Sequence, residues 1–416
     1  MTGVRNDASA AVRRWITAHT HALTESGPNG PLADLGPLEA MLADAAIVGV
    51  GETTRAAHEV TVLGHRVLRV LVEHLGFRVL AIQDDESAVA GLDSYVRTGA
   101  GDPLTALREL WVPWRTQEML AVVEWARSFN QRQPGDPLRL VGLQPPAARP
   151  ADYRAVLDQV AQMGGEEAYD AVRRHYDTIV TAHEVPEHVQ HSRGTHPGRR
   201  FADHAQDALR LVAALPGAAE RPDALERARL IVDFHTASFA GGGYDYAAVR
   251  RRSVAAMTRL VQEDGVKVAY WEGMSFTANA ARLEPVTPLE SFRSVGHELR
   301  RRLGSRYFSL LIAFGQGDVS RLHPGQHVPP PSADSADAVL TAAGPDRFVL
   351  DLRTPRPDPV AAWLRGPHRL RGIGGIYDAA ADHDHYLTTG PLDEWFDAVV
   401  HVRTVTPTNL LSHRPR

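Results

Sequence analysis

The feature that most constrains this 416-residue chain is a short apolar run that ends in an acidic residue and passes directly into a helical pattern. Residues 46–59 read AIVGVGETTRAAHE, in which the run from Ala46 to Val50 stops at Gly51 and Glu52 follows. A strand that ends in this way before a helix places its polar groups at the carboxyl edge of a sheet, where open α/β folds build their sites. We therefore expect Glu52 to belong to a functional site.

Strand and helix patterns alternate along most of the chain, which indicates an α/β fold with a mostly parallel central sheet flanked by helices. The predicted strands are 46–50, 78–83, 138–143, 266–271, 307–314 and 347–352. The predicted helices of this alternating part are 9–25, 58–74, 104–110, 115–130 and 288–303.

Residues 151–262 interrupt the alternation, because they lack strand signals and read as long helices. The predicted helices there are 151–163, 166–183, 200–215, 221–239 and 245–262. We expect a helical insertion at 151–262 over the carboxyl edge of the sheet. Residues 1–150 and 263–416 would then be the N-terminal and C-terminal parts of one α/β core.

Seven segments follow one another in an order known from one protein family. They are LVEHLGFRVLAIQ (71–83), GLDSYVRTGAGDP (91–103), WRTQEMLAVVEWARSFN (114–130), LRLVGLQ (138–144), VKVAYWEGMSF (266–276), GHELRRRLGSRYFSLLIAFGQG (296–317) and LRGIGGIYDAAADHDHYLTTGPLDEWFDAVVHVRTVTP (370–407). With the segment around Glu52, they extend the similarity from about Leu38 to Pro407. The chain resembles the erythromycin esterase family, which includes succinoglycan biosynthesis-type proteins. The resemblance implies the same fold, with the helical insertion, and a hydrolase-like site.

The chain departs from the family at the positions that carry its chemistry. The family follows its glycine-glutamate pair with a catalytic histidine three residues after the glutamate, and that position is Arg55 here. Gly273 and Phe276 stand where the family has two histidines after Trp271. Because histidine is the ordinary base at neutral pH, the resemblance implies a remodelled site that does not hydrolyse macrolide esters in the usual way.

Other family positions are partly retained. The retained ones are Glu52, His65 and Arg66, and the changed ones are Gly64 for an arginine, Gln83 for an acidic residue and Met257 for an asparagine.

Four side chains are the candidates for catalysis. Glu52 can act as a base or an acid if burial raises its pKa, or it can simply stabilise a helix dipole. Arg55 can pair with Glu52 and anchor an anionic or carbonyl group. Glu272 ends the neighbouring strand and can divide acid and base roles with Glu52, unless it is a surface acid. His65 is the other candidate for proton transfer, with a satisfied buried histidine as the alternative.

Further residues are candidates for substrate binding. His58 lies three residues after Arg55, so on a helix the two would share a face, and His58 could supply the missing base. Its alternative is a solvated helix start. The other candidates are Arg66, Gln83, Trp114, Glu118, Tyr244 and Phe276. Aromatic residues in this number are also common in a protein core.

The segment HEVPEHVQHSRGTH (183–196) is rich in histidine, yet its spacing argues against a metal. A His-Glu pair followed by three residues and a histidine is one residue too long for a zincin helix, and Pro186 breaks the turn that would align the ligands. The loop cluster DHDHY (382–386) is a weaker pattern of the same kind. We expect no metal ligand and no cofactor.

Composition excludes several classes. The chain has no cysteine, so it has no disulfide, cysteine nucleophile or thiolate metal site. Its formal charge of −5 comes with interspersed acids and bases, so a nucleic-acid partner is not expected. No apolar run approaches the roughly 20 residues that span a bilayer, and the first residues lack a signal-peptide pattern. We expect a cytoplasmic bacterial protein without a membrane partner, and the oligomeric state stays open.

These observations favour an enzyme of bacterial natural-product metabolism, such as antibiotic biosynthesis. It would use acid–base chemistry on a polyketide or peptide substrate, in a hydrolysis, elimination, cyclisation or isomerisation. The alternative is a non-catalytic pseudo-esterase that binds a ligand or a partner protein in the same cleft.

Overall fold

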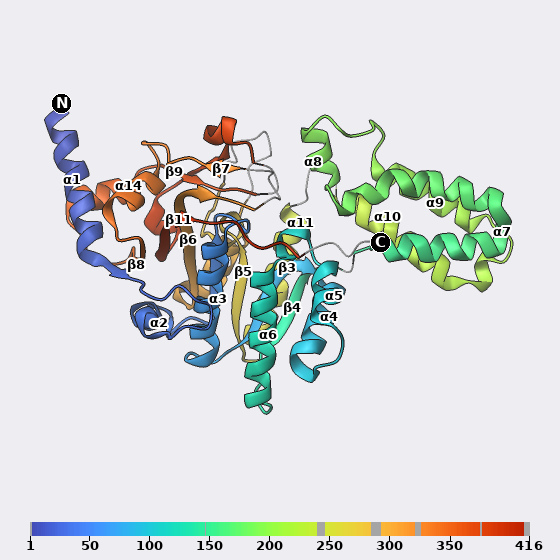
Figure 1. The fold of residues 1–416 in the computed structure, drawn as a ribbon, viewed down its shortest axis with the longest axis horizontal. Coiled ribbons are helices and arrows are strands. Elements are labelled where there is room, and N and C mark those ends of the chain that lie inside the picture. Colours follow the sequence, from blue (N-terminus) through green and yellow to red (C-terminus); the bar gives the residue numbers. More distant parts are fainter. Residues whose placement is uncertain are drawn as a thin grey trace. The chain divides into compact units, whose positions relative to one another are not determined.

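The computed structural model describes residues 2–145, 147–238, 246–283, 293–320, 326–374 and 377–411 (Figure 1). By their contacts these residues form two compact units. The first comprises Met1–Asp84, Val89–Leu143 and Arg250–Arg416, and the second comprises Asp85–Ala88 and Gln144–Val249. Within the described ranges, no helix is both long and apolar enough to cross a membrane.

The first unit is built on a nine-stranded sheet with the order β1-β8-β11-β6-β2-β5-β3-β4, in which β7 also pairs with β6. The pairs β11·β6, β6·β2, β2·β5 and β5·β3 are parallel, whereas β8 is antiparallel to both β1 and β11. The strands are β1 (Thr20–Ala22), β2 (Ile47–Glu52), β3 (Phe77–Asp85), β4 (Arg139–Gln144), β5 (Lys267–Gly273), β6 (Tyr307–Asp318), β7 (His327–Val328), β8 (Arg347–Asp351) and β11 (Ala398–Val405). The expected α/β fold with a mostly parallel sheet is confirmed.

A separate two-stranded ribbon is formed by β9 (His368–Arg371) and β10 (Tyr386–Thr389). The strands β1, β7, β9, β10 and β11 lie outside the ranges predicted from the sequence. The predicted helix 9–25 is wrong at its end, because the helix stops at His19 and Thr20–Ala22 pairs with β8 instead.

Helices cover both faces of this sheet (Figure 1). Adjacent residues of β11 point to opposite faces. His401 bonds Thr341 of α14, whereas Val402 lines a cleft together with Glu59 of α3. The helices are α1 (Thr2–His19), α2 (Gly36–Leu42), α3 (His58–Glu73), α4 (Glu86–Thr98), α5 (Pro103–Glu109), α6 (Gln117–Arg132), α11 (Tyr246–Gln262), α12 (Met274–Thr277), α13 (Val295–Leu303), α14 (Ala336–Ala343), α15 (Asp358–Arg365) and α16 (Leu392–Trp395).

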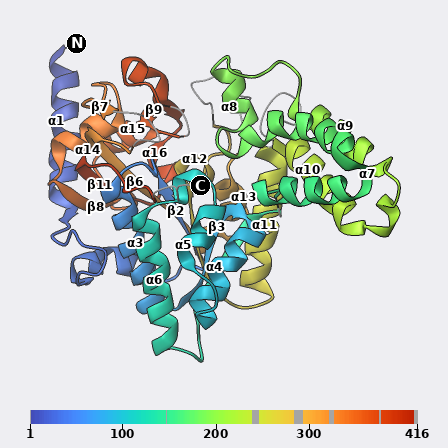
Figure 2. The same ribbon diagram turned by 45° about the vertical axis from the view of Figure 1, so that its right-hand side comes forward.

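The second unit is helical, with α7, α9 and α10 side by side in both ribbon views (Figures 1 and 2). Its helices are α7 (Pro150–Ile179), α8 (Glu187–Ser192), α9 (Phe201–Ala213) and α10 (Pro222–Ser238). Val156, Tyr176, Phe201 and Ile231 belong to its buried core. The sequence predicts a break in α7 near Gly165, and the helix is kinked there by a positive φ of 70° that glycine tolerates. From residue 250 onward α11 belongs to the first unit.

Candidate active site

Two glutamates come from the ends of adjacent parallel strands. Glu52 is the last residue of β2, and Glu272 is the next-to-last residue of β5. The register pairs Gly51 with Glu272 and Glu52 with Gly273. The expectation that a second carboxylate comes from a neighbouring strand is therefore confirmed, and both acids lie at the carboxyl edge where α/β folds place their sites.

One arginine joins the two carboxylates. Nε of Arg55 forms an ion pair with Oε1 of Glu52, and Nη2 of the same side chain forms one with Oε1 of Glu272. The guanidinium carbon also lies 4.1 Å from the ring centroid of Trp114 and 5.3 Å from that of Trp111. A planar, fork-shaped cation suits both kinds of contact at once, so Arg55 is fixed by its neighbours on several sides.

The second oxygen of Glu52 is held by a tryptophan. Nε1 of Trp271 donates a 2.8 Å hydrogen bond to Oε2 of Glu52. The Trp271 ring packs closely over Gly64 of α3, where an added Cβ would lie 2.3 Å from ring atom Cζ2. The glycine that replaces the family's arginine thus leaves the space that this ring occupies. Trp271 belongs to the family-like segment 266–276, but nothing in the sequence indicates that it forms this hydrogen bond.

Burial raises the pKa of Glu52 to about 7, although the Arg55 charge acts to lower it. The charge of Glu272 adds to the rise, and the hydrogen bond from Trp271 opposes it. Burial also acts to lower the pKa of Arg55, but the two carboxylates outweigh it and the net shift is upward. Arg55 therefore stays charged, while Glu52 can take up and release a proton near neutral pH.

Arg55 and His58 do not share a helix face, so that expectation is wrong. Residues 53–56 form bends and turns, and α3 begins only at His58. The turn is held by its own short bonds, such as the 3.1 Å bond from the Ala56 N–H to Oγ1 of Thr54. It directs Arg55 toward the strand ends, and His58 instead bonds Glu118 with 2.7 Å between Nδ1 and Oε1.

The pair of His58 and Glu118 is tied to the end of the chain. Glu118 also accepts from the backbone N–H of Asn409 at 3.1 Å and from its side-chain amide at 2.9 Å. The hydrogen bond to Glu118 raises the pKa of His58, with burial acting against it. Both predicted binding residues thus hold the C-terminal segment over the starts of α3 and α6.

His65 and Arg66 make their contacts elsewhere. Burial lowers the pKa of His65 to about 3, and its ring stands edge-on to Trp125 with 5.3 Å between centroids. Arg66 is fully buried and bonds Asp34 at 2.6 Å and the carbonyl of Pro31 at 2.7 Å. The contacts of His65 are those of a buried core residue, and the contacts of Arg66 hold the loop around Asp34 in place. The catalytic role of His65 and the binding role of Arg66 stay predictions.

The other predicted residues are dispersed. Gln83 accepts a 2.9 Å hydrogen bond from the Tyr270 hydroxyl. Phe276 lies in the short helix α12 and packs against the apolar cluster of Ile47 and Tyr270. Tyr244 lies outside the described residues. Asp84, near the end of β3, accepts a 2.9 Å bond from the Trp111 N–H, and its charge acts on Arg55.

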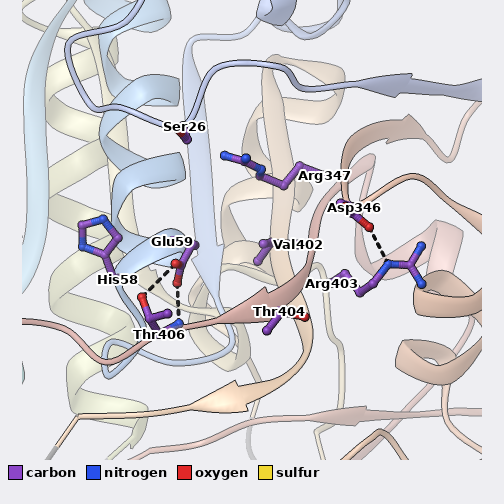
Figure 3. Close-up of a pocket in the computed structure, with 9 residues that line it drawn as sticks. All are labelled: Ser26, His58, Glu59, Asp346, Arg347, Val402, Arg403, Thr404 and Thr406. Carbon is purple, nitrogen blue, oxygen red and sulfur yellow. Dashed lines mark hydrogen bonds and ion pairs between the residues drawn. The ribbon is translucent and has the colours of Figure 1, made fainter.

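A cleft of about 650 Å³ opens beside the starts of α3 and β8 (Figure 3). Its lining residues are Ser26, His58, Glu59, Asp346, Arg347, Val402, Arg403, Thr404 and Thr406. Glu59 fixes one wall by bonding the backbone and the hydroxyl of Thr406 at 2.7 and 2.8 Å. The lining includes His58 but none of the ion-paired residues Glu52, Arg55 and Glu272. We place the candidate chemistry at the ion-paired group, because there charged side chains converge, at the carboxyl edge of the parallel sheet, on a carboxyl group with a near-neutral pKa.

Comparison with known proteins agrees with this fold. The sequence model of the erythromycin esterase family matches residues 72–405, and the chain belongs to that family. It is 30% identical to the Bacillus subtilis protein named "Putative hydrolase YbfO" over 132 residues, which are 31% of this chain and 28% of that protein. The matched residues therefore cover less than a third of the length of that relative.

Three solved structures share the fold. A Bacillus cereus protein superposes with a TM-score of 0.66 at 22% identity, covering 97% of this chain and 99% of that one. A succinoglycan biosynthesis protein gives 0.65 at 21% identity, with 98% and 99% covered. A mutant of the erythromycin esterase EreC in its open conformation gives 0.57 at 16% identity, with 95% and 99% covered. Membership of this family makes the chain hydrolase-like.

Proposed function

We propose that the protein is an erythromycin esterase-like enzyme that uses Glu52 as its acid–base group. The observation that carries this proposal is the burial of Glu52 beside a second carboxylate, with one arginine between them and a pKa of about 7. A group with that pKa is populated in both protonation states at neutral pH, which is the condition for efficient proton transfer.

In this proposal the three charged residues have separate roles. Ionised Glu52 accepts a proton from water or from the substrate, and protonated Glu52 returns one to the leaving group. Arg55 stabilises negative charge that develops in the transition state, because its guanidinium is preorganised by Glu272 and by the Trp114 ring. Hydrolysis, elimination, cyclisation and isomerisation all need such a proton transfer.

The substrate we propose is a polyketide or peptide natural product, handled in the bacterial cytoplasm. The support is the family itself and the relative named as an erythromycin esterase. No usual macrolide esterase activity is proposed, since Arg55, Gly273 and Phe276 replace the histidines that the family resemblance implies.

A second candidate function is a non-catalytic ligand- or partner-binding protein. The observation that favours it is the saturation of Arg55, whose guanidinium pairs with both glutamates and lies against Trp114. A cation held in this way has fewer donors left for a substrate. In that case the ion-paired group stabilises the strand ends, and a ligand occupies the separate cleft beside α3.

The substitution Glu52→Gln separates the two candidates, because it keeps the shape and removes the titrating charge. We expect a panel of esters, lactones and cyclic peptides, followed by mass spectrometry, to reveal a substrate for the parent chain. Glu52→Gln should then slow the chemical step by roughly 100-fold or more while ligand affinity changes by less than about tenfold.

The matched control is Glu124→Gln, which removes an exposed glutamate from α6 and should leave turnover unchanged. Full turnover of the true substrate by Glu52→Gln would exclude the proposed role. Ligand binding by the parent chain without turnover of any compound in the panel would favour the binding protein.

A further inference from the structure

The second unit contains a group of three side chains that the catalytic proposal does not use. Glu187 and His191 lie four residues apart on α8, so they face the same side of the helix. His196 comes from the loop that follows. One ligand atom from each of the three lies within 4.8 Å of the others, and no larger group of this kind occurs in the described residues.

Close contacts already link these side chains. Nε2 of His196 lies 3.0 Å from Oε1 of Glu187, and the rings of His191 and His196 stack with 3.7 Å between centroids. His191 is exposed at the rim, whereas Glu187 is fully buried. The group therefore has a closed inner end and an open outer end.

The buried carboxylate has one oxygen that the protein does not satisfy. Oε1 of Glu187 accepts from His196 and, at 2.8 Å, from the backbone N–H of Phe201. Its other oxygen, Oε2, has no hydrogen-bond partner among the described residues. A buried carboxylate oxygen without a partner is costly, so the group lacks a positive ligand at this point.

We propose that Glu187, His191 and His196 bind a divalent transition-metal ion, with zinc as the best match. Two imidazoles and one carboxylate are a common protein ligand set for zinc, and three ligands leave a coordination position for water. The ion satisfies the second oxygen of Glu187 and separates the two stacked rings.

Binding has a definite local cost. The Gly198 N–H lies 3.0 Å from Nδ1 of His196, so in the metal-free state Nδ1 accepts this bond and Nε2 carries the ring hydrogen. A metal ion on Nε2 moves that hydrogen to Nδ1 and displaces Gly198. The ion thus ties α8 to the loop before α9, and it rearranges residues 196–198 when it binds.

The test uses the tag-free, full-length chain after dialysis against a chelator. We expect elemental analysis to find one zinc per chain after reconstitution, and Co²⁺ to give the visible absorption of a low-symmetry site. His191→Ala should weaken zinc binding by more than about 100-fold, because loss of an outer-shell partner alone costs about 10–100-fold. His191 is exposed, so circular dichroism should show an intact fold in this variant.

The matched control is His204→Ala, which removes the other close histidine pair of this unit. Nδ1 of His204 lies 3.1 Å from Nδ1 of His175. This variant should keep one zinc with unchanged affinity, and Glu187→Gln should lose it. Failure of the parent chain to retain zinc, equal binding by His191→Ala, or loss of zinc in His204→Ala would each overturn the proposal. None of these readouts depends on enzymatic activity, so the site is tested independently of the role of Glu52.

Discussion

The indole ring of Trp271 occupies the space where a side chain of residue 64 would stand. Only glycine fits there, because an added Cβ would lie 2.3 Å from Cζ2 of the ring. The same ring donates the hydrogen bond that holds Oε2 of Glu52. The helix α3 and the carboxylate at the end of β2 are therefore coupled through one side chain.

We predict that Gly64→Ala destabilises the protein by about 1–3 kcal/mol, the usual cost of overpacking a buried site. The displaced ring should also weaken its bond to Glu52. Urea denaturation measures the stability, and tryptophan fluorescence reports the ring. The control Gly91→Ala lies in the interior of α4, where the nearest atom would be 3.7 Å from the new Cβ. It should be neutral or stabilising by up to about 1 kcal/mol, and a similar loss in both variants would contradict the packing argument.

The stability of the fold should depend on pH through Glu52. Its pKa rises from 4.5 to about 7 on folding, so the native state binds this proton more tightly than the unfolded state. The stabilisation is complete below pH 4.5, decreases as the pH rises, and is lost above about pH 7. Integrated over that interval, the effect is about 3 kcal/mol.

The Glu52→Gln variant isolates this contribution, because it cannot titrate at position 52. Between about pH 5 and about pH 8 the free energy of unfolding of the parent should fall relative to that of the variant, because only the parent loses the proton at position 52. Subtracting the two curves removes the contribution of Asp337, another buried acid whose pKa is raised to about 7. A difference that does not change with pH would show that Glu52 has an ordinary pKa.

Removing Arg55 should cost more at high pH than at low pH. The substitution Arg55→Gln leaves two buried carboxylates without their cation, and breaking a buried ion pair typically costs about 3–5 kcal/mol. Below pH 7 Glu52 takes up a proton, so the loss should shrink. Arg301→Gln is the control, because Arg301 is mostly exposed and pairs with Glu298 at 3.1 Å. Surface pairs contribute about 1 kcal/mol or less, so equal losses in the two variants would count against a buried ion-paired group.

Purified protein should not open macrolide lactones at the rate expected of an esterase with the family's histidines. The basis is Arg55 in place of the first histidine, with Gly273 and Phe276 in place of the other two. Liquid chromatography with mass spectrometry detects the ring-opened product as a gain of one water. An erythromycin esterase assayed in parallel provides the positive control, and efficient ring opening by this chain would refute the prediction.

The meeting of Glu52 and Glu272 is predictable from sequence, because parallel strands end at the same edge of a sheet. The position of Arg55 is not predictable in the same way. The sequence pattern suggests a helix that already includes Arg55, whereas in the structure the helix begins only at His58. What stops the helix is tertiary, since Ala57 forms a bridge with Pro407 at the far end of the sequence.

Buried polar residues also make some elements hard to predict from the sequence. His401 interrupts the apolar pattern of β11, and its burial is possible because its ring hydrogen-bonds Thr341 of α14. Similarly, the spacing of the histidines around Pro186 argues against a metal, because the pattern assumes that all ligands lie on one helix. His196 reaches Glu187 from a loop, and no sequence period encodes that approach.

Two carboxylates and one guanidinium meet at the strand ends, so the net charge of this group depends on one proton. When Glu52 is protonated, the charges of Arg55 and Glu272 cancel. Once Glu52 loses its proton, the group carries one excess negative charge, and Asp84 adds to the same local field. Under the proposed function, this negative charge disfavours an anionic substrate relative to a neutral or amine-bearing one. The protonation state of Glu52 thus sets the net charge at this edge of the sheet.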